Sequence, residues 1–449
     1  MKKANLILSI LIFSFLSARA QQKKEVSIKG ILVHFSNQVE VEDMSAFQYL
    51  LPKKTERLII PEDTSGHFQI RFPLTKAGYF RIGRNQLYLS PGDNLTVYID
   101  YNDPRAARFE GKGSNANDFL RFTPFPKGGS YLEAGGKTKE TPYETIQYIL
   151  WAAEERRKQL DSIILVSNEF IQLEDGRIKA DIINSLLDGQ IVFYRPRSMR
   201  KDSVKLKIYG DEYAELIKSE VDKYLKGFTD ASLLDLVVYR DLADTLVKQT
   251  GPATDIQKMN DWLKATEFVG EMKKVSDKAK LKEFGKSIAS IKTIEYRNAL
   301  NSMLNNLLKF GKGDKAIDFA AMDITGKKMN LSSLKGKLIY VDLWATWCGP
   351  CLAEMPKLEA LKEKYKENTA IAFVSLSIDD NLELWKKSVS ARNAGGYQWQ
   401  INRNKLVDYD IVGIPRVLLI GKDFKMIDMN ALLPSSTKLM ALLDELLKQ

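Results

Sequence analysis

The chain is poor in the residues that build metal centres and disulfide frameworks. It has 449 residues, of which two are cysteine and two are histidine. The histidines, His34 and His67, fall in expected strands far from the cysteine pair, where a packed or surface side chain is their usual role. A structural zinc site needs about four ligands close together, and small secreted scaffolds use many more cysteines. We therefore expect no metal site and no structural disulfide framework.

Long apolar segments are equally scarce. The main one, residues 6–16, is 11 residues long, whereas a membrane-spanning helix needs about 17 to 25. Two lysines precede it and a small-x-small triplet at residues 18–20 follows it, as in a secretory signal peptide with its cleavage site. We expect residues 1–20 to be a cleaved signal, with the protein in the periplasm or cell envelope and without a permanent membrane span. A retained anchor is the open alternative.

Charge is not concentrated anywhere in the chain. The formal net charge is +10, and it is spread along the sequence without a dense block of lysine or arginine. Proteins that bind nucleic acid gather such side chains into a patch or run. The charge therefore favours solubility and gives no reason to expect a nucleic-acid partner.

Residues 21–120 are predicted to form an antiparallel β-domain. Apolar and polar side chains alternate over 68–72 and again over 95–99, which is the period of a half-buried strand. A Pro-Gly-Asp turn at 91–93 separates strands, and a polar stretch at 111–117 ends the pattern. A sandwich of two sheets is one arrangement that fits this pattern.

Over residues 121–310 the apolar period changes to that of helices. Apolar residues recur at helical spacing in these segments: 146–160, 213–225, 233–246, 259–272 and 294–308. We interpret these stripes as packing surfaces, because core is their usual role. No motif in this middle region indicates chemistry.

Residues 311–449 show the alternation of an α/β fold, after a Gly-rich linker at 311–314. The strands are expected at 338–344, 371–377, 417–420 and 426–429. The helices are expected at 351–365, 382–391 and 437–447. The fold class is therefore multidomain, with a β-rich N-terminal domain, an α-helical middle and a C-terminal α/β domain.

The two cysteines lie three residues apart where a buried strand gives way to a helix, in the sequence Cys348-Gly349-Pro350-Cys351. Backbone N–H groups and the dipole at a helix N-terminus stabilise a thiolate, which lowers the pKa of a thiol from its free value of about 8.5. Cys348 is therefore the predicted nucleophile. Cys351, one helical turn later, is the predicted resolving thiol, and Pro350 suits the first turn of a helix.

With these elements in view, residues 313–449 resemble the thioredoxin-like thiol-disulfide oxidoreductases of the bacterial envelope, the family of TlpA and ResA. The resemblance rests on the WCGPC motif, Asp342, Pro356 and the Gly413-Ile414-Pro415 triplet in this order and spacing. It implies a thioredoxin-like fold, disulfide-bearing protein substrates, a membrane thiol electron donor and no cofactor. Some relatives serve cytochrome c assembly. The N-terminal region resembles the β-domains that precede such domains.

The resemblance also implies roles for residues around the cysteines. Pro415 is expected to be cis and to face the disulfide, and the backbone of Ile414 is expected to pair with an extended substrate peptide. We expect Trp347 to shield the active sulfur and offer an apolar contact, the alternative being a core aromatic. Arg416 either makes the substrate groove more cationic than usual or lies solvated on the surface.

Asp342 is out of place in its strand. Its neighbours in 338–344 are apolar, as in a strand covered on both faces, and an uncompensated charge in a core is expensive. We expect a buried acid with a raised pKa that serves as a proton relay for Cys351. The alternative is a side chain that caps a nearby turn.

The sequence thus predicts a periplasmic protein-disulfide reductase with a redox-active Cys348–Cys351 disulfide. Gly-Pro between the cysteines favours the reducing side of the scale, where thioredoxin has about −270 mV and the strong periplasmic oxidase about −120 mV. Disulfide isomerase activity is the enzymatic alternative. The non-enzymatic alternative is an envelope binding protein whose thioredoxin-like domain is only a scaffold.

Overall fold

The computed structural model describes residues 24–35, 39–51, 58–59, 65–123, 131–379, 381–409, 411 and 413–448. The expected signal peptide, residues 1–20, lies outside the described residues. Within the described ranges, no helix combines the length and the apolar character needed to cross a membrane.

The N-terminal part contains a four-stranded and a three-stranded β-sheet that share a hydrophobic core, together with a two-stranded sheet. The strands are β1 Lys24–Val33, β2 Val39–Glu40, β3 Glu42–Asp43, β4 Leu58–Ile59, β5 His67–Leu74, β6 Gly78–Ile82, β7 Asn85–Leu89, β8 Asn94–Asp100 and β9 Arg108–Lys112. One sheet has the order β5-β1-β8-β9, the other β3-β6-β7, and β2 pairs with β4. Ile28 of β1 and Phe80 of β6 belong to one buried cluster. The expected β-domain is present, with a sandwich-like core.

One strand pairing corrects the expectation of an antiparallel domain. β1 and β8 run parallel, with Ile28 opposite Leu95, whereas β1 and β5 are antiparallel. The chain leaves this sheet after β5, forms the β6–β7 hairpin in the second sheet, and then returns as β8. Such a crossover connection is what a parallel pairing requires.

The middle of the chain is helical, as predicted. Its helices are α1 Ser114–Leu120, α2 Pro142–Asp161, α3 Asn168–Asp188, α4 Ser203–Leu225, α5 Val237–Arg240, α6 Ala243–Leu246, α7 Ala253–Met272, α8 Lys278–Ala289 and α9 Ile294–Lys309. Their apolar stripes form one core, which confirms the interpretation as packing surfaces. Tyr79 and Tyr88 of the β-sheets also belong to this core. The domain boundary at residue 120 stays a prediction.

The helical pattern expected over 233–246 is broken. A short 3-10 helix at Ala231–Asp235 precedes α5 and α6. Leu236, between this 3-10 helix and α5, is extended, with φ −90° and ψ 122°. The carbonyl of Leu234 lies at this break and accepts a hydrogen bond from Arg240 Nη1 at 2.7 Å. A buried arginine thus satisfies a carbonyl that a continuous helix would have bonded internally.

The C-terminal part is an α/β unit around a seven-stranded sheet of order β11-β10-β14-β13-β12-β15-β16. Its elements are β10 Ala320–Asp323, β11 Lys328–Asn330, β12 Leu338–Trp344, α10 Gly349–Lys364, β13 Ile371–Ser377, α11 Leu382–Ala391, β14 Tyr397–Gln400, β15 Arg416–Ile420, β16 Met426–Asp428 and α12 Leu439–Lys448. The predicted elements are confirmed within two residues at most ends. The sequence reading missed β10, β11 and β14, which are short.

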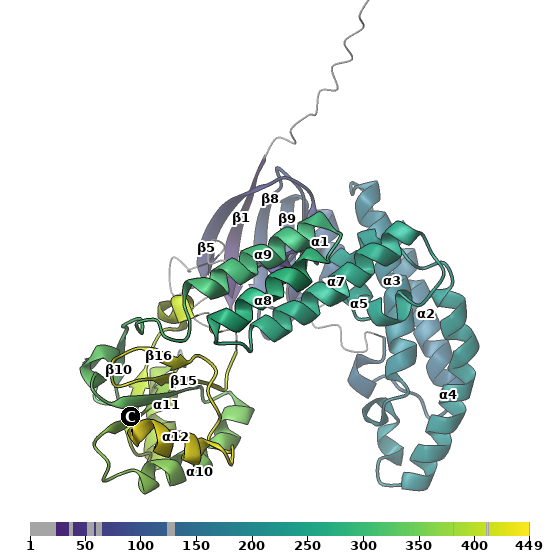
Figure 1. Ribbon diagram of the computed structural model, residues 1–449. Coiled ribbons are helices and arrows are strands. Elements are labelled where there is room, and N and C mark those ends of the chain that lie inside the picture. The colour runs from purple at the N-terminus through teal and green to yellow at the C-terminus, as the bar shows by residue number, and fades with distance from the viewer. Residues whose placement is uncertain are drawn as a thin grey trace, which may run out of the picture.

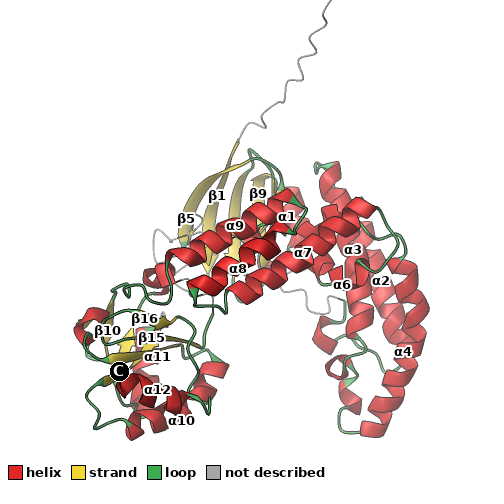
Figure 2. Cartoon of the chain, in the orientation of Figure 1, coloured by secondary structure: helices red, strands yellow, loops and turns green. Residues whose placement is uncertain are grey.

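The figures show how these parts are arranged. In Figure 1 the long helices α2, α3 and α4 lie side by side at one end of the molecule, and the C-terminal unit lies at the other. Figure 2 shows the strands gathered in two separate places, with helices between them.

Hydrogen bonds join the helical middle to the C-terminal unit. Ser276 Oγ, between α7 and α8, donates to Asp428 Oδ1 of β16 at 2.5 Å. The linker residue Lys312 donates its N–H to the Ser276 carbonyl at 3.2 Å.

Candidate active site

Cys348 is the N-cap residue of α10. Strand β12 ends at Trp344, and the helix begins at Gly349, two residues earlier than predicted. The Cys348 Sγ atom accepts a hydrogen bond from the backbone N–H of Cys351 at 3.2 Å. A sulfur in this position lies against the N–H groups that the first helical turn leaves without internal partners, which stabilises negative charge on it.

The two cysteines form a disulfide with a Cα–Cα distance of 5.2 Å. In this oxidised state both side chains are almost fully buried, with exposed fractions of 5% for Cys348 and 2% for Cys351. Trp347, beside them in sequence, is 65% exposed. The alternative of Trp347 as a core aromatic is therefore wrong, and its ring is available to a partner at the surface next to the disulfide.

A buried carboxylate fixes the loop that leads to Cys348. Asp379, which follows β13, accepts hydrogen bonds from the Thr346 N–H at 3.0 and 2.9 Å and from the Thr346 hydroxyl at 2.7 Å. The Ser377 hydroxyl donates to the same carboxylate at 2.7 Å. Asp379 is 2% exposed, so these bonds are shielded from water. Thr346 is thereby held two residues before the reactive sulfur.

Asp342 lies in the middle of β12 and is 4% exposed. Burial raises the pKa of Asp342 to about 7 from 3.8; Lys362 and Arg392 oppose this rise, and Glu354 and Glu359 add to it. Among the described residues no turn N–H donates to this carboxyl group, so the turn-capping alternative has no support. The carboxyl group can therefore exchange a proton near neutral pH.

The face of α10 that carries Cys351 packs towards the sheet face that carries Asp342. Cys351, Met355, Leu358 and Lys362 are buried and recur at helical spacing on one side of α10. Ser375 of β13 pairs in register with Asp342 of β12, and register partners direct their side chains to the same face of a sheet. Lys362 Nζ donates to Ser375 Oγ at 2.9 Å, so α10 covers that face.

The expected substrate-contact residues lie at the same end of the sheet as the cysteines. The Ile414–Pro415 peptide bond is cis, as the resemblance implied. Pro415 precedes β15, whose first residue, Arg416, pairs with Leu343 near the end of β12. The Gly413 to Pro415 segment thus precedes β15 at the end of the sheet where β12 ends, the end from which the chain continues to Cys348. Ile414, Pro415 and Arg416 are all partly exposed.

Sequence reasoning missed two buried charged residues of this region, Asp379 and Lys362. Lys362 occupies a position at helical spacing from Cys351 that is otherwise apolar, and this misplaced charge is a signal that could have identified it. Asp379 comes directly after a buried strand, but a carboxylate at the end of a strand usually faces solvent. Its contact with Thr346 depends on the tertiary fold.

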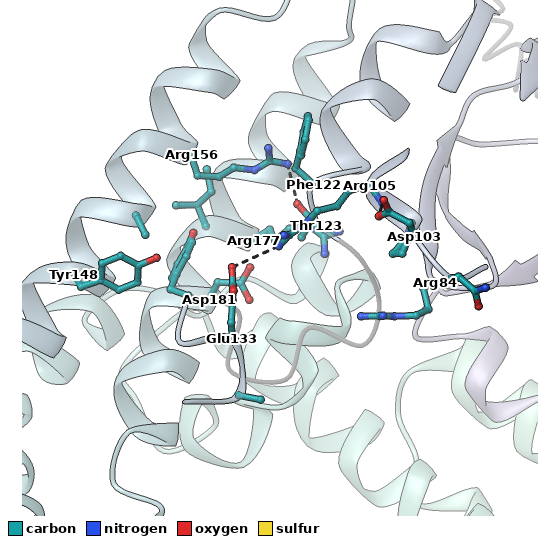
Figure 3. Close-up of a pocket in the computed structure, with 16 residues that line it drawn as sticks. Arg84, Asp103, Arg105, Phe122, Thr123, Glu133, Tyr148, Arg156, Arg177 and Asp181 are labelled. Atoms are coloured by element: carbon teal, nitrogen blue, oxygen red, sulfur yellow. Dashed lines mark hydrogen bonds and ion pairs between the residues drawn. The ribbon is translucent and has the colours of Figure 1, made fainter. Parts of the chain in front are cut away.

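A cavity of about 600 Å³ lies far from the cysteines along the chain, between the β-sheets and helices α2 and α3. Figure 3 shows arginine side chains from several elements around it. Arg156 donates to Thr123 Oγ1 at 2.8 Å and Arg105 to Glu133 at 3.5 Å, and Arg177 pairs with the buried Glu174. These cations already bond to protein groups that join the β-sheets to the helices, so we assign no chemistry to this cavity.

The cysteine pair at the start of α10, after the central strand β12, defines a thioredoxin-like redox centre, and comparison with known proteins agrees. The Thioredoxin-like family model matches residues 336–426. The thiol-disulfide oxidoreductase ResA of Bacillus thuringiensis (strain Al Hakam) is 33% identical over 120 residues, 26% of this chain and 67% of ResA. The thioredoxin-like protein YneN of Bacillus subtilis is 27% identical over 112 residues, 25% of this chain and 66% of YneN.

Among solved structures, a candidate thiol-disulfide oxidoreductase of Bacteroides vulgatus is 39% identical; the match covers 31% of this chain and 98% of that one, with a TM-score of 0.30. On the similarity to ResA, the chain belongs to the thioredoxin-like thiol-disulfide oxidoreductases. It is a redox enzyme of this type, with an intact cysteine pair. The alternative of a scaffold without activity is set aside.

Proposed function

We propose that the protein is a periplasmic protein-disulfide reductase in which Cys348 is the nucleophile and Cys351 the resolving thiol. The observation that carries this proposal is the Cys348 sulfur at the α10 N-terminus, where it accepts the Cys351 N–H. The same environment favours the thiolate in the reduced protein. Gly349 and Pro350 between the cysteines support the reducing direction.

The reaction proceeds in two exchanges. The Cys348 thiolate attacks one sulfur of a substrate disulfide, a mixed disulfide forms, and the other substrate sulfur leaves as a thiolate that takes up a proton. The Cys351 thiol then gives its proton to the Asp342 carboxylate, and its thiolate attacks Cys348 Sγ. The second substrate sulfur leaves and is protonated. The substrate has gained two electrons, and the enzyme holds the Cys348–Cys351 disulfide until a thiol donor reduces it.

The surface beside the disulfide supports a site for an extended peptide. We propose that Trp347 contacts the substrate through its exposed ring and that the Ile414 backbone, before cis Pro415, pairs with the substrate chain. Arg416 adds positive charge at the edge of this proposed site. The donor is proposed to be a membrane thiol protein, with cytochrome c assembly as one process that such a reductase serves.

Two parallel assays test the direction of the reaction. The reduced protein should reduce a protein disulfide substrate faster than an equal amount of free dithiol does, and Cys348→Ser should abolish this rate. On a substrate with scrambled disulfides, a reductase yields reduced chains and little native activity. Recovery of native activity without an added dithiol would instead identify a disulfide isomerase, which uses the same thiolate.

A further inference from the structure

Lys362 is a buried cation that the redox reaction described above does not use. Its side chain lies on the inner face of α10 and the residue is 7% exposed. Burial lowers the pKa of Lys362, although Glu359 and Asp342 favour its charged form. A lysine is rarely buried in this way unless paired, so its contacts indicate what it is paired with.

The ammonium group is held in one place by three hydrogen bonds. Nζ donates to Glu359 Oε1 at 2.8 Å, to Ser375 Oγ at 2.9 Å and to the Gly395 carbonyl at 2.9 Å. These acceptors come from α10, from β13 and from the segment before β14. An ammonium group has three N–H donors, so all of them are used and the charge has a fixed position.

That position is beside Asp342. Ser375, which accepts from Lys362, is the register partner of Asp342 on the neighbouring strand. In register pairs of adjacent strands the side chains lie about 5 Å apart on one face. The face of α10 that bears Lys362 is also the face that bears Cys351. The ammonium group, the carboxyl group and the resolving cysteine therefore share the layer between α10 and the sheet.

We propose that Lys362 is a positioning residue of the redox centre, whose fixed ammonium group sets how firmly Asp342 holds a proton. The inference deepens the proposed function, because its consequence for the reaction rests on Asp342 as the proton acceptor of Cys351. Without a nearby cation, a carboxyl group this deeply buried would keep its proton at neutral pH and could accept none. With the cation beside it, part of the carboxyl population is ionised and ready to accept the Cys351 proton.

Other charged groups also influence the pKa of Asp342. They are Glu354 and Glu359 of α10 and Arg392 after α11, in addition to Lys362. On the same strand, burial and, in turn, the charge of Asp342 raise the pKa of Tyr340. Glu354 is engaged with the Ser435 N–H and hydroxyl at 2.8 Å each. Arg392 stacks on the Trp344 ring, 4.5 Å from its centroid. On β15, the register partner of Asp342 is the apolar Val417. Of the two cations, Lys362 is the more deeply buried.

The test follows the titration of Asp342 directly. Carbon-13 NMR of labelled aspartate carboxyl groups is recorded on the oxidised full-length protein, in which neither cysteine titrates, and Asp342→Asn identifies the signal. Lys362→Met removes the charge and keeps an unbranched side chain. It is expected to raise the Asp342 pKa by about one unit or more, whereas Lys362→Arg, which keeps the charge, should largely restore the parental value.

Two further variants make the result specific. Glu359→Gln removes a carboxylate near Asp342 and should move its pKa downward, opposite to Lys362→Met. Lys366→Met is the matched control, because Lys366 also pairs with a glutamate three residues earlier but is 56% exposed; it should leave the Asp342 pKa unchanged. Lys362→Met also removes packing contacts, so the titrations of Lys362→Arg and Glu359→Gln decide the question where Lys362→Met does not fold.

The pH dependence of mixed-disulfide resolution separates this inference from the proposed function. If Lys362→Met moves both the Asp342 pKa and the pH midpoint of resolution, the inference stands. If the Asp342 pKa is unchanged in both Lys362→Met and Glu359→Gln, the inference about Lys362 is overturned. The proposed proton transfer from Cys351 to Asp342 still stands in that case if Asp342→Asn slows resolution. In a third outcome, Lys362→Met shifts the Asp342 pKa, but neither Lys362→Met nor Asp342→Asn changes the rate at which the mixed disulfide is resolved. This outcome supports Lys362 as the counter-charge of Asp342 and overturns the role of Asp342 as proton relay.

Discussion

The backbone N–H of Cys351 points at the sulfur of Cys348, 3.2 Å away, across the first turn of α10. The second cysteine of the motif thus contributes an N–H donor to the first, in addition to its own thiol. Because this donor belongs to the backbone, it is retained when the Cys351 side chain is replaced, so the effect of the helix terminus on Cys348 can be measured in isolation.

The first prediction concerns the acidity of Cys348. In the Cys351→Ser variant Cys348 is the chain's one thiol, and its thiolate can be followed by ultraviolet absorbance at increasing pH. We expect a pKa between about 6 and 7.5, below the free value of about 8.5, because the helix N-terminus stabilises the anion. A pKa at or above the free value would show that the helix end does not activate this sulfur.

The second prediction assigns the two sulfurs. Cys351→Ser should accumulate mixed disulfides with protein substrates, since Cys348 still attacks but no thiol resolves the adduct. Cys348→Ser should capture almost none, because Cys351 lies inside α10 and the sulfur at position 348 is the one that caps the helix N-terminus. Non-reducing gels of the two variants, incubated with the same disulfide substrate, make the comparison. Capture by Cys348→Ser in preference to Cys351→Ser would reverse the assignment.

The third prediction is that Asp342 costs stability above neutral pH. The folded chain holds the Asp342 proton more firmly than the unfolded chain, because burial raises its pKa to about 7 from 3.8. The cost is absent below about pH 4, where both states are protonated, and is complete above about pH 7, where the buried group must ionise. At about 1.4 kcal/mol per pKa unit, a rise of about three units corresponds to roughly 4 kcal/mol, so Asp342→Asn should raise the free energy of unfolding by up to roughly 4 kcal/mol at pH 8.

Urea denaturation of the oxidised proteins at pH 8 and pH 4 measures this difference. The gain should shrink towards zero at pH 4, and the exposed-site control Asp423→Asn, whose side chain is 59% exposed, should change little at either pH. A variant that loses stability at pH 8 would mean that the Asp342 carboxylate is a structural group. Resolution of the mixed disulfide should become slower in Asp342→Asn around neutral pH.

The fourth prediction concerns the Asp379 contact with Thr346. Asp379→Ala leaves the partly buried N–H and hydroxyl of Thr346 without acceptors, which costs roughly 2 to 4 kcal/mol of unfolding free energy. Asp318→Ala is the matched control, because Asp318 also accepts from the N–H and hydroxyl of one residue, Ser332, at 2.8 and 2.6 Å, but in an exposed place. It should cost less than about 1 kcal/mol. Equal losses in the two variants would show that burial of the Thr346 contact adds nothing.

The fold could be predicted from the sequence where the spacing of the apolar residues and the local composition indicate the same kind of element. The apolar run of β12 and the helical stripe of α10 are unambiguous, so the strand, the helix and the position of Cys348 between them could be predicted. β14 was missed because Gln398 and Gln400 interrupt a short strand whose burial comes from neighbouring elements. The parallel pairing of β1 with β8 was missed because pairing partners depend on the path of the chain, which local patterns do not record.

For the site, the sequence was sufficient to identify the two cysteines of the motif and the one charged residue inside an apolar strand. Asp342 could be found because a carboxylate inside an apolar strand is conspicuous. Lys362 interrupts the apolar stripe of α10 but was overlooked, and Asp379 could not be assigned because an aspartate after a strand is common on protein surfaces. Their importance arises from Ser375 and Thr346, partners that lie 13 and 33 positions away in sequence.

The reduction potential of the Cys348–Cys351 pair is the most direct test of the central claim that the protein works as a reductase. It is measured on the full-length protein by equilibration with glutathione buffers of known potential, with the redox state read from thiol alkylation. A reductase should have a value between about −200 and −300 mV, on the reducing side of the envelope range. A value above about −150 mV would contradict the central claim and place the protein among the oxidases.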